Sequence, residues 1–359
     1  MIGLSFVIYH LSFSPVKAQT VPYLPGVTPE GAVYYLPKTA IRVTVRVAST
    51  TYTPGDFCKY AERYLRLNNV ATEPDVSHKV VYISQMPIAI ADTSKAFSVK
   101  FDAKSVVANV ELSEDGRLLA INAKVEEEDM PQPFVPAPHT APINPRKFLS
   151  EDILSAGSTA KMAELTAQEI YDIRENRSLL IKGQADFMPK DGEQLRLMLN
   201  QLEQQDAALT SLFTGTTQSD TTEHVFIVMP DRPIDHQILF RLSKWRGLVD
   251  ADDLSGAPYY ISVTNLATVP ASEVENPTNA AKLKSQKSKF KGVFVNVPSR
   301  MRSVIYQGND QVDQAEMPAP QFGHTEMLSE QLFNKRYTTQ LWLDPISGAV
   351  QRLKAEQPK

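Results

Sequence analysis

Six histidines, one cysteine and a few short acidic runs are the groups in this chain with the most obvious capacity for chemistry. Two histidines at i and i+4 on a helix, as in HExxH, bind zinc, but this chain has no such pair and no cysteine pair. His224 and His236 flank an expected pair of strands and could meet in space as a metal site, although polar residues are ordinary at strand ends. We therefore predict no metal site and no cofactor.

Cys58 is the single cysteine, so an intramolecular disulfide is excluded. A nucleophilic role would need a positioned base and a lowered thiol pKa, and the expected place of Cys58 near a helix N-terminus would favour the thiolate. Its position at the margin of an apolar stripe favours a half-buried structural cysteine instead. The chain also lacks GxSxG, P-loop and GxGxxG motifs. We predict no catalytic residues and expect a protein that is not an enzyme.

The acidic run Asp250-Ala-Asp-Asp-Leu-Ser-Gly256 resembles a calcium loop but lacks the continuing oxygen ligands and the glutamate at position 12, so we interpret it as a solvated acidic turn. The paired carboxylates of glycosidases leave no local spacing, so a carbohydrate-active or carbohydrate-binding protein remains the alternative function. Adjacent aromatics on a strand point to opposite faces, and half of them should be core. The aromatic residues that could stack on a sugar are Tyr34, Tyr35, Tyr259, Tyr260, Trp245 and Trp342.

The composition excludes several classes of protein. A net charge of -4 gives no electrostatic reason to expect nucleic acid as a partner. No stretch after Phe13 approaches the ~20 apolar residues of a transmembrane helix, so we predict that the chain is not a transmembrane protein. Peripheral association with a membrane is compatible with the sequence. The 25 prolines against 15 glycines favour strand edges and connections over a helical bundle.

The first eighteen residues have the pattern of a secretory signal peptide. An apolar run over Ile2–Phe13 precedes Val16-Lys17-Ala18, an A-x-A-like cleavage site, while the alternative is a buried N-terminal strand. No cysteine follows the expected cut, so the sequence predicts no lipid anchor. We expect a periplasmic or outer-membrane-associated protein.

Residues 19–129 are expected to form a β-rich domain with one packed helix over 56–67. Ile41, Val43, Val45 and Val47 alternate strictly and should face a core, leaving Arg42, Thr44 and Arg46 on a solvated face. Glu114-Asp115-Gly116 predicts a hairpin turn.

Six prolines between Met130 and Pro145 mark residues 130–146 as an extended linker. Residues 147–215 should form a helical hairpin. Its first helix has a capping box at Thr166 and Glu169 and ends at Gly183, and its second runs from near Asp191 to Gly215.

Residues 216–359 return to strand patterns and predict a β-sandwich-like domain, which makes the whole chain an α+β protein. Within it, Gly292–Pro298 resembles Gly31–Pro37, and a strand-turn-strand unit follows each of them, at 112–118 and 343–350. Two explanations of this similarity remain open. One is an internal duplication, and the other is that strand-proline and strand-turn-strand patterns are common in β proteins.

Several stretches together resemble a family of exported Bacteroidetes proteins catalogued as domain of unknown function 4831. The resemblance covers nearly all of the mature chain and is most specific in TPGDFCKYAERYLRL. It implies the cell envelope of a Gram-negative anaerobe and assigns no activity or catalytic residues. The stretches that carry it are 31–39, 51–67, 91–93, 170–183, 185–186 and 212–215.

These observations favour a non-enzymatic scaffold or accessory subunit that binds other envelope proteins. The long helix pair offers the most suitable surface, and the polar side of its second helix is our candidate binding face. That face comprises Glu193, Arg196, Gln201, Gln204 and Gln205.

Overall fold

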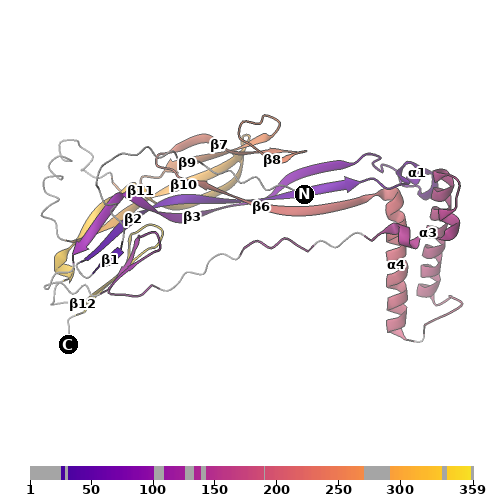
Figure 1. Ribbon diagram of the computed structural model, residues 1–359, viewed down its shortest axis with the longest axis horizontal. Coiled ribbons are helices and arrows are strands. Elements are labelled where there is room, and N and C mark those ends of the chain that lie inside the picture. The colour runs from indigo at the N-terminus through magenta and orange to yellow at the C-terminus, as the bar shows by residue number, and fades with distance from the viewer. Residues whose placement is uncertain are drawn as a thin grey trace.

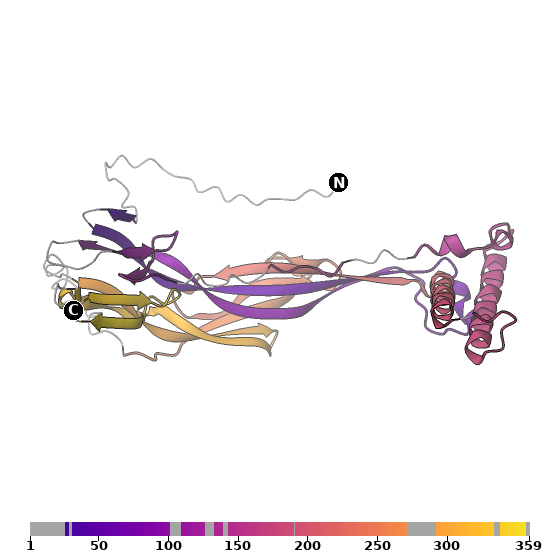
Figure 2. The same ribbon diagram turned by 90° about the horizontal axis from the view of Figure 1, so that it is seen from below.

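The computed structural model describes residues 26–28, 31–100, 109–125, 133–138, 143–189, 191–270, 292–333 and 338–356. The molecule is elongated, with most strands at one end and the long helices at the other (Figure 1). A narrow ribbon of strands joins the two ends, as the perpendicular view also shows (Figure 2). The expected signal peptide, residues 1–18, lies outside the described residues.

Strands outnumber helices in the described chain, and the predicted β-rich α+β class is confirmed. The helices are η1 (Cys58–Tyr60), α1 (Ala61–Leu65), η2 (Pro145–Phe148), α2 (Glu151–Leu154), α3 (Thr159–Lys182), α4 (Gly192–Thr214) and η4 (Glu330–Phe333). The strands are β1 (Gly26–Thr28), β2 (Gly31–Thr53), β3 (Asp75–Lys100), β4 (Val110–Leu112), β5 (Leu118–Ile121), β6 (Thr216–Val228), β7 (Ile234–Ser243), β8 (Gly247–Val249), β9 (Ala257–Asn265), β10 (Gly292–Gln307), β11 (Asp310–Ser329), β12 (Thr338–Leu343) and β13 (Val350–Glu356).

The strand β2 is the central strand of the first sheet. It pairs with β3 along nearly its whole length, with β1 at its start and with β6 from Ile41 onward. Pro37 fits inside β2 because it lies after the last residue paired with β1 and before the first residue paired with β6, so among the described strands neither of these two needs a backbone N–H at this position. The two expected strand runs on either side of Pro37 are therefore one continuous strand.

The alternation from Ile41 to Val47 places its four aliphatic residues in a core, as predicted. They pack against a second sheet of order β11-β10-β9-β7-β8, whose inward residues include Phe240, Ile261 and Met301. The two sheets form a β-sandwich. We use the name body for this sandwich together with the third sheet, which is described next.

A third sheet of order β13-β12-β5-β4 closes the end of the body farthest from the long helices. It packs on the starts of β2 and β10 around Tyr34, Leu36, Val295 and Leu341. Because β5 pairs with β12 and β6 pairs with β2, segments 26–121 and 216–356 contribute strands to the same sheets.

The two similar sequence stretches occupy equivalent places in this body. The N–H of Tyr35 donates to the carbonyl of Gly116 at 2.9 Å, and the N–H of Asn296 donates to the carbonyl of Gly348 at 3.1 Å. Tyr35 and Asn296 are the fifth residues of their stretches, and each glycine lies in the turn of the hairpin that follows. The matching contacts favour an internal repeat.

The outer side of β2 is not simply solvated. The Arg46 guanidinium lies 4.7 Å from the Tyr82 ring centroid and 4.3 Å from that of Phe134, and it pairs with Glu223 at 2.9 Å. Phe134 belongs to the proline-rich linker, so the described residues 133–138 lie against the strands. The expected solvated face is therefore corrected at Arg46, because contacts from β3, β6 and the linker partly cover it.

Candidate functional site

The outer ends of β2, β3 and β6 form a three-stranded shaft between body and helices. We define the shaft by its paired segments 49–53, 75–78 and 216–220. It ends in the tip, which comprises η1, α1, η2, α2, α3 and α4 (Figures 1 and 2).

A compact hydrophobic core fixes the tip to the end of the shaft. The N–H of Phe57 donates to the carbonyl of Leu212 at 2.7 Å, and the rings of Phe57 and Phe213 lie 5.5 Å apart. The expected helix over 56–67 is a short 3-10 turn that runs into the five-residue α1, and its buried residues Ala61 and Leu65 join this core. The predicted apolar stripe therefore packs the first element of the tip against α3 and α4.

The helix boundaries are set by side-chain caps and glycines. Ser158 caps α3 by accepting from the N–H of Lys161, so the predicted capping box at Thr166 is wrong. Thr166 is buried inside α3, and its hydroxyl donates to the carbonyl of Met162. The expected stop at Gly183, which has a φ of 71°, is confirmed.

The second long helix begins and ends as predicted. Asp191 caps α4 by accepting from the N–H of Gln194 at 2.7 Å, and Gly215 follows its last residue. The two helices are joined along one side by ion pairs. Arg174 contacts Asp206 at 2.9 Å, and its guanidinium also donates to the hydroxyl of Thr210 at 3.2 Å.

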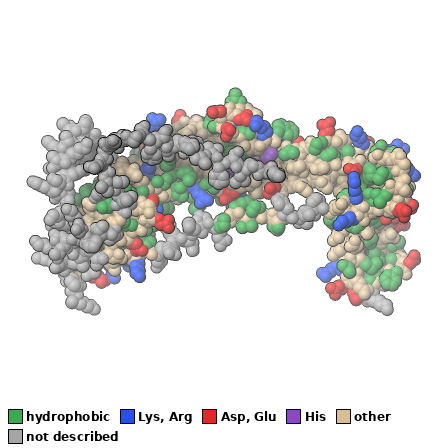
Figure 3. Space-filling view, viewed as in Figure 1, with side chains coloured by type: hydrophobic (Ala, Val, Ile, Leu, Met, Phe, Trp, Pro, Cys, Tyr) green, Lys and Arg blue, Asp and Glu red, His purple; other side chains and the backbone are tan. Residues whose placement is uncertain are grey.

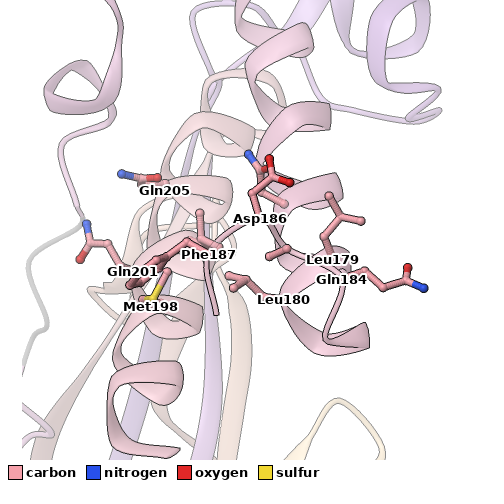
Figure 4. A pocket seen from close by; sticks show the side chains of 11 residues that line it. Leu179, Leu180, Gln184, Asp186, Phe187, Met198, Gln201 and Gln205 are labelled. Carbon is pink, nitrogen blue, oxygen red and sulfur yellow. The ribbon is translucent and has the colours of Figure 1, made fainter. Parts of the chain in front are cut away.

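A groove of about 510 Å³ opens between the distal halves of α3 and α4. Figure 4 shows Met198, Gln201 and Gln205 reaching it from α4, and Leu179, Leu180 and Gln184 from the other helix and its end. Asp186 and Phe187 come from the connection between the helices, and Phe187 is 67% exposed. The lining residues are Asn176, Leu179, Leu180, Gln184, Ala185, Asp186, Phe187, Met198, Gln201, Leu202 and Gln205.

The groove combines an apolar floor with an amide-rich rim. Leucine, methionine and phenylalanine side chains supply the apolar surface, and four amide side chains can both donate and accept hydrogen bonds. Asp186 is the single charged residue of the lining. Hydrophobic side chains also reach the surface elsewhere on the tip, as Figure 3 shows, and Ile181 and Leu197 are 63% and 70% exposed.

The structure divides the predicted binding face of α4 into two groups. Gln201 and Gln205 line the groove, whereas Glu193, Arg196 and Gln204 are exposed residues outside its lining. Met198, Asp186 and Phe187, which also line the groove, are not among the predicted site residues. A partial signal was present in α4, where Met198, Leu202 and Gln205 follow one another in steps of four and three on the side of the helix that packs toward α3.

In the part of the chain that the structure describes, the other groups considered for chemistry do not lie together in one site. Cys58 is a half-buried free thiol, and the described chain contains no group of three or more His, Cys, Asp or Glu residues that could hold a metal ion. His224 contacts the hydroxyl of Thr222, while His236 contacts Asp235 at 2.7 Å. Asp253 pairs with Arg246 at 2.7 Å within the acidic turn.

The aromatic residues divide between core and surface, as their strand positions predicted. Tyr259 is buried, whereas its neighbour Tyr260 lies beside the His236 ring, with a centroid distance of 6.2 Å. Trp342 lines a hollow of about 630 Å³ at the far end of the body, together with Lys124, Gln351 and other residues. This hollow lies in the sheet opposite the tip.

Comparisons with known proteins give one match. Residues 30–351 match the family described as Domain of unknown function (DUF4831). No curated protein and no solved structure matches the chain. Among the described helices, none has the length and apolar character needed to cross a membrane.

Proposed function

Because the chain belongs to the DUF4831 family, whose description assigns no activity, we propose that it is a non-enzymatic scaffold or accessory subunit of the cell envelope. In this proposal its tip binds another envelope protein, and the groove between α3 and α4 is the contact surface. The shaft holds that surface at a distance from the body.

The observation that carries the proposal is the position of an open, partly apolar groove at the far end of an elongated molecule. Exposed apolar surface is costly in water, and on protein surfaces it commonly marks a site of association. Phe187 and Leu197 are largely exposed on the same hairpin. A partner bound at the tip would meet little steric hindrance from the body.

The polar rim favours a polypeptide as the occupant. Amides of Asn176, Gln184, Gln201 and Gln205 both donate and accept, which matches the polar groups of another protein surface. The apolar floor supplies the buried centre that protein interfaces need, while the amides form a rim.

We place this function in the periplasm or at the outer membrane. Support comes from the signal-peptide pattern of residues 1–18. Mass spectrometry of the N-terminus of the protein from cell-envelope fractions tests this placement, since cleavage after Ala18 is the expected result.

Site-directed photocrosslinking tests the binding surface. In a Cys58→Ser background, Gln201→Cys places a benzophenone label in the groove, and Gln204→Cys places it on the exposed side of the same helix. The labelled proteins are added to native envelope extracts and irradiated. We expect one partner to be captured from position 201 and to bind again as a purified protein.

The matched position 204 is the control, because it shares the helix and the label but not the groove. Equal capture from both positions would indicate nonspecific labelling. Failure of position 201 to capture any protein that rebinds would rule out the groove as the binding surface.

The hollow beside Trp342 favours carbohydrate binding as a second candidate function. The indole N–H of Trp342 donates to the carbonyl of Lys124 at 3.2 Å, which orients the ring. Lys124 and Arg352 also line the hollow, and the Arg352 guanidinium lies 5.1 Å from the centroid of the Trp342 ring. Aromatic and cationic side chains together suit an acidic sugar. Binding to acidic glycans on an array that is lost in Trp342→Ala would support this candidate, and an unchanged profile would exclude it.

A further inference from the structure

We infer that the outer edge of β6 takes an extended segment of another polypeptide, which adds to the first sheet as a further strand. Strand addition of this kind draws its affinity from backbone hydrogen bonds and its specificity from alternating side chains. The inference goes beyond the proposed function, because it assigns a second attachment site along the side of the molecule, apart from the groove at the tip.

The strand β6 is long and has a strand neighbour on one side. Its 13 residues extend over about 44 Å, whereas most strands in globular proteins have five or six residues. It pairs with β2 along its whole length, and no other strand of the described chain pairs with it (Figure 1). A long row of backbone groups is therefore open on its outer side.

A contact of β3 shows which backbone groups of β6 point to this edge. The N–H of His78 donates to the carbonyl of Lys244 at 2.8 Å, so it points away from β2. Ser49, which lies opposite His78, therefore directs its backbone groups to the other side, toward Asp220 of β6. Backbone direction alternates along a strand, and the pairing of β2 with β6 has no register shift. The N–H groups of the odd-numbered residues of β6 thus point to the open edge.

The edge lacks the features that usually prevent strand pairing. Natural edge strands are protected by prolines, lysines, bulges or short length. The strand β6 contains no proline, glycine, lysine or arginine, and the carboxylate of Glu223 is held by Arg46 at 2.9 Å. Val225 and Ile227, whose N–H groups point outward, are 44% and 57% exposed. The half of β6 nearer the body therefore combines an open ladder with exposed apolar side chains.

A hollow of about 620 Å³ lies beside the middle of the strand. One wall is formed by residues 220–223 of β6, and the other belongs to the linker. The linker residues of this wall are Phe134, Pro136, Ala137 and Pro138. Proline has no backbone N–H, so this segment is poorly suited to complete the ladder. The hollow provides space beside β6 for a further strand, with the linker as its outer wall.

The paired side of β6 indicates which side chains suit the open side. Arg46 of β2 lies opposite Glu223 and pairs with its carboxylate, while Val43 lies opposite Phe226. The same β6 residues border the open edge, where Phe226 is only partly buried. Opposite charges and apolar pairs across neighbouring strands are stabilising. We therefore expect a partner strand that alternates aliphatic residues with polar ones, including a basic residue that faces Glu223.

The geometry favours a different polypeptide over a second copy of β6. Residues 134–138 line the hollow beside residues 220–223, which lie at the middle of the strand. A two-fold pairing of two β6 strands about their middle would bring the linkers of both copies into the same space. The strand β6 also has no lysine or arginine to face Glu223 of a second copy.

A synthetic peptide tests the inference. The probe is a capped, fluorescein-labelled peptide with the sequence of residues 41–48, the part of β2 with which β6 already pairs. Two controls have the same sequence but carry N-methyl groups on alternate backbone amides, one on the odd and one on the even positions. An added strand directs one of these two sets of N–H groups to β6.

We expect the unmethylated peptide to bind the purified chain in fluorescence anisotropy. One methylated control should bind at least about tenfold more weakly, and the other within about threefold of the unmethylated peptide. Equal effects of the two methylation patterns, or no binding of the unmethylated peptide, would overturn the inference.

Variants connect the binding to β6. Val225→Pro removes an N–H that points to the open edge and leaves the hydrogen bonds to β2 in place, so it should weaken peptide binding at least about tenfold. Val225→Ala is the matched control, because it shortens the side chain and keeps the N–H. Circular dichroism checks the fold, and Ile227→Pro with Ile227→Ala provides a second pair. Unchanged binding in a folded proline variant would contradict the assignment.

One further measurement identifies the occupant. If sedimentation of the purified chain shows a dimer that Val225→Pro dissociates, the edge pairs with a second copy and the inference fails. Capture from position 201 does not involve β6, so failure of the proposed function and failure of this inference are distinguishable.

Discussion

At the scale of single residues, Tyr34 connects two strands that are distant in sequence. Its hydroxyl donates to the carbonyl of Phe294 at 3.1 Å and accepts from the N–H of the same residue at 2.8 Å. Burial raises the pKa of the Tyr34 phenol well above its ordinary value, although the hydrogen bond to the Phe294 backbone acts in the opposite direction. One side chain therefore satisfies both backbone groups of Phe294.

We expect Tyr34→Phe to lower the free energy of unfolding by about 1–3 kcal/mol, because it leaves two backbone groups of Phe294 without their partner. Urea denaturation measures this change. The matched control is Tyr82→Phe, since Tyr82 is 44% exposed. A Tyr34→Phe variant as stable as the control would show that the hydrogen bonds contribute nothing net.

Asp115 predicts a pH dependence of stability. Burial acts to raise its pKa, but hydrogen bonds from Ser113 and Arg117 and the Arg117 charge outweigh burial, so its pKa lies below the ordinary 3.8. The folded state therefore favours the carboxylate. The stabilisation is present above the ordinary pKa and is lost as the pH falls through the lowered folded value.

The Asp115→Asn variant tests this dependence. Its side chain is 40% exposed in the wild type, so we expect a loss of less than about 1 kcal/mol at neutral pH. The difference between wild type and variant should shrink between about pH 5 and pH 3. Guanidinium denaturation at several pH values measures it, and a difference independent of pH would contradict the assignment.

At the scale of elements, the turn between β2 and η1 fixes the tip to α4. Gly55 lies so close to α4 that an added Cβ would be 2.2 Å from the carbonyl oxygen of Leu212. That oxygen also accepts the Phe57 N–H. The glycine in the TPGDFC stretch is therefore explained by close approach of two backbones.

The substitution Gly55→Ala should destabilise the tip by about 1–3 kcal/mol, because backbone must shift to admit the methyl group. Hydrogen exchange should increase in α1 and the end of α4 while the body stays protected. Gly157→Ala is the matched control, since nothing lies within 4 Å of its added Cβ. Equal exchange in both variants would show that the tip tolerates the contact.

At the scale of the whole molecule, the two strand-rich segments are interleaved. Strand β6 extends the sheet of β2, and β12 pairs with β5. Each segment thus provides strand neighbours that the other needs, and exposed strand edges would remain if either were removed.

We therefore expect residues 216–359 expressed alone to show no cooperative unfolding transition, because β6 would lose its partner β2 and β12 would keep only β13. Co-expression with residues 19–215 should restore a folded complex. Thermal unfolding followed by circular dichroism, together with co-purification, measures both. A cooperative transition of the isolated segment would contradict this prediction.

The candidate site was predicted from sequence in part. Helical periodicity and the stops at Gly183 and Gly215 located the hairpin, and two of the five proposed residues, Gln201 and Gln205, line the groove. The predicted binding face of α4 was chosen by the polar nature of its residues and not by their position around the helix. It therefore also contained Glu193, which is exposed outside the groove. Phe187 could not be assigned to the groove because its place depends on how the helices pack.

The local features of this protein can be predicted from its sequence. The alternation from Ile41 to Val47, the Asp191 cap and the terminal glycines follow from contacts between residues near each other in the chain, which single segments encode. The pairing of strands, the contact of Phe134 with Arg46 and the groove between α3 and α4 arise in the folded chain. These features depend on contacts between residues far apart in sequence, and no local spacing specifies such contacts.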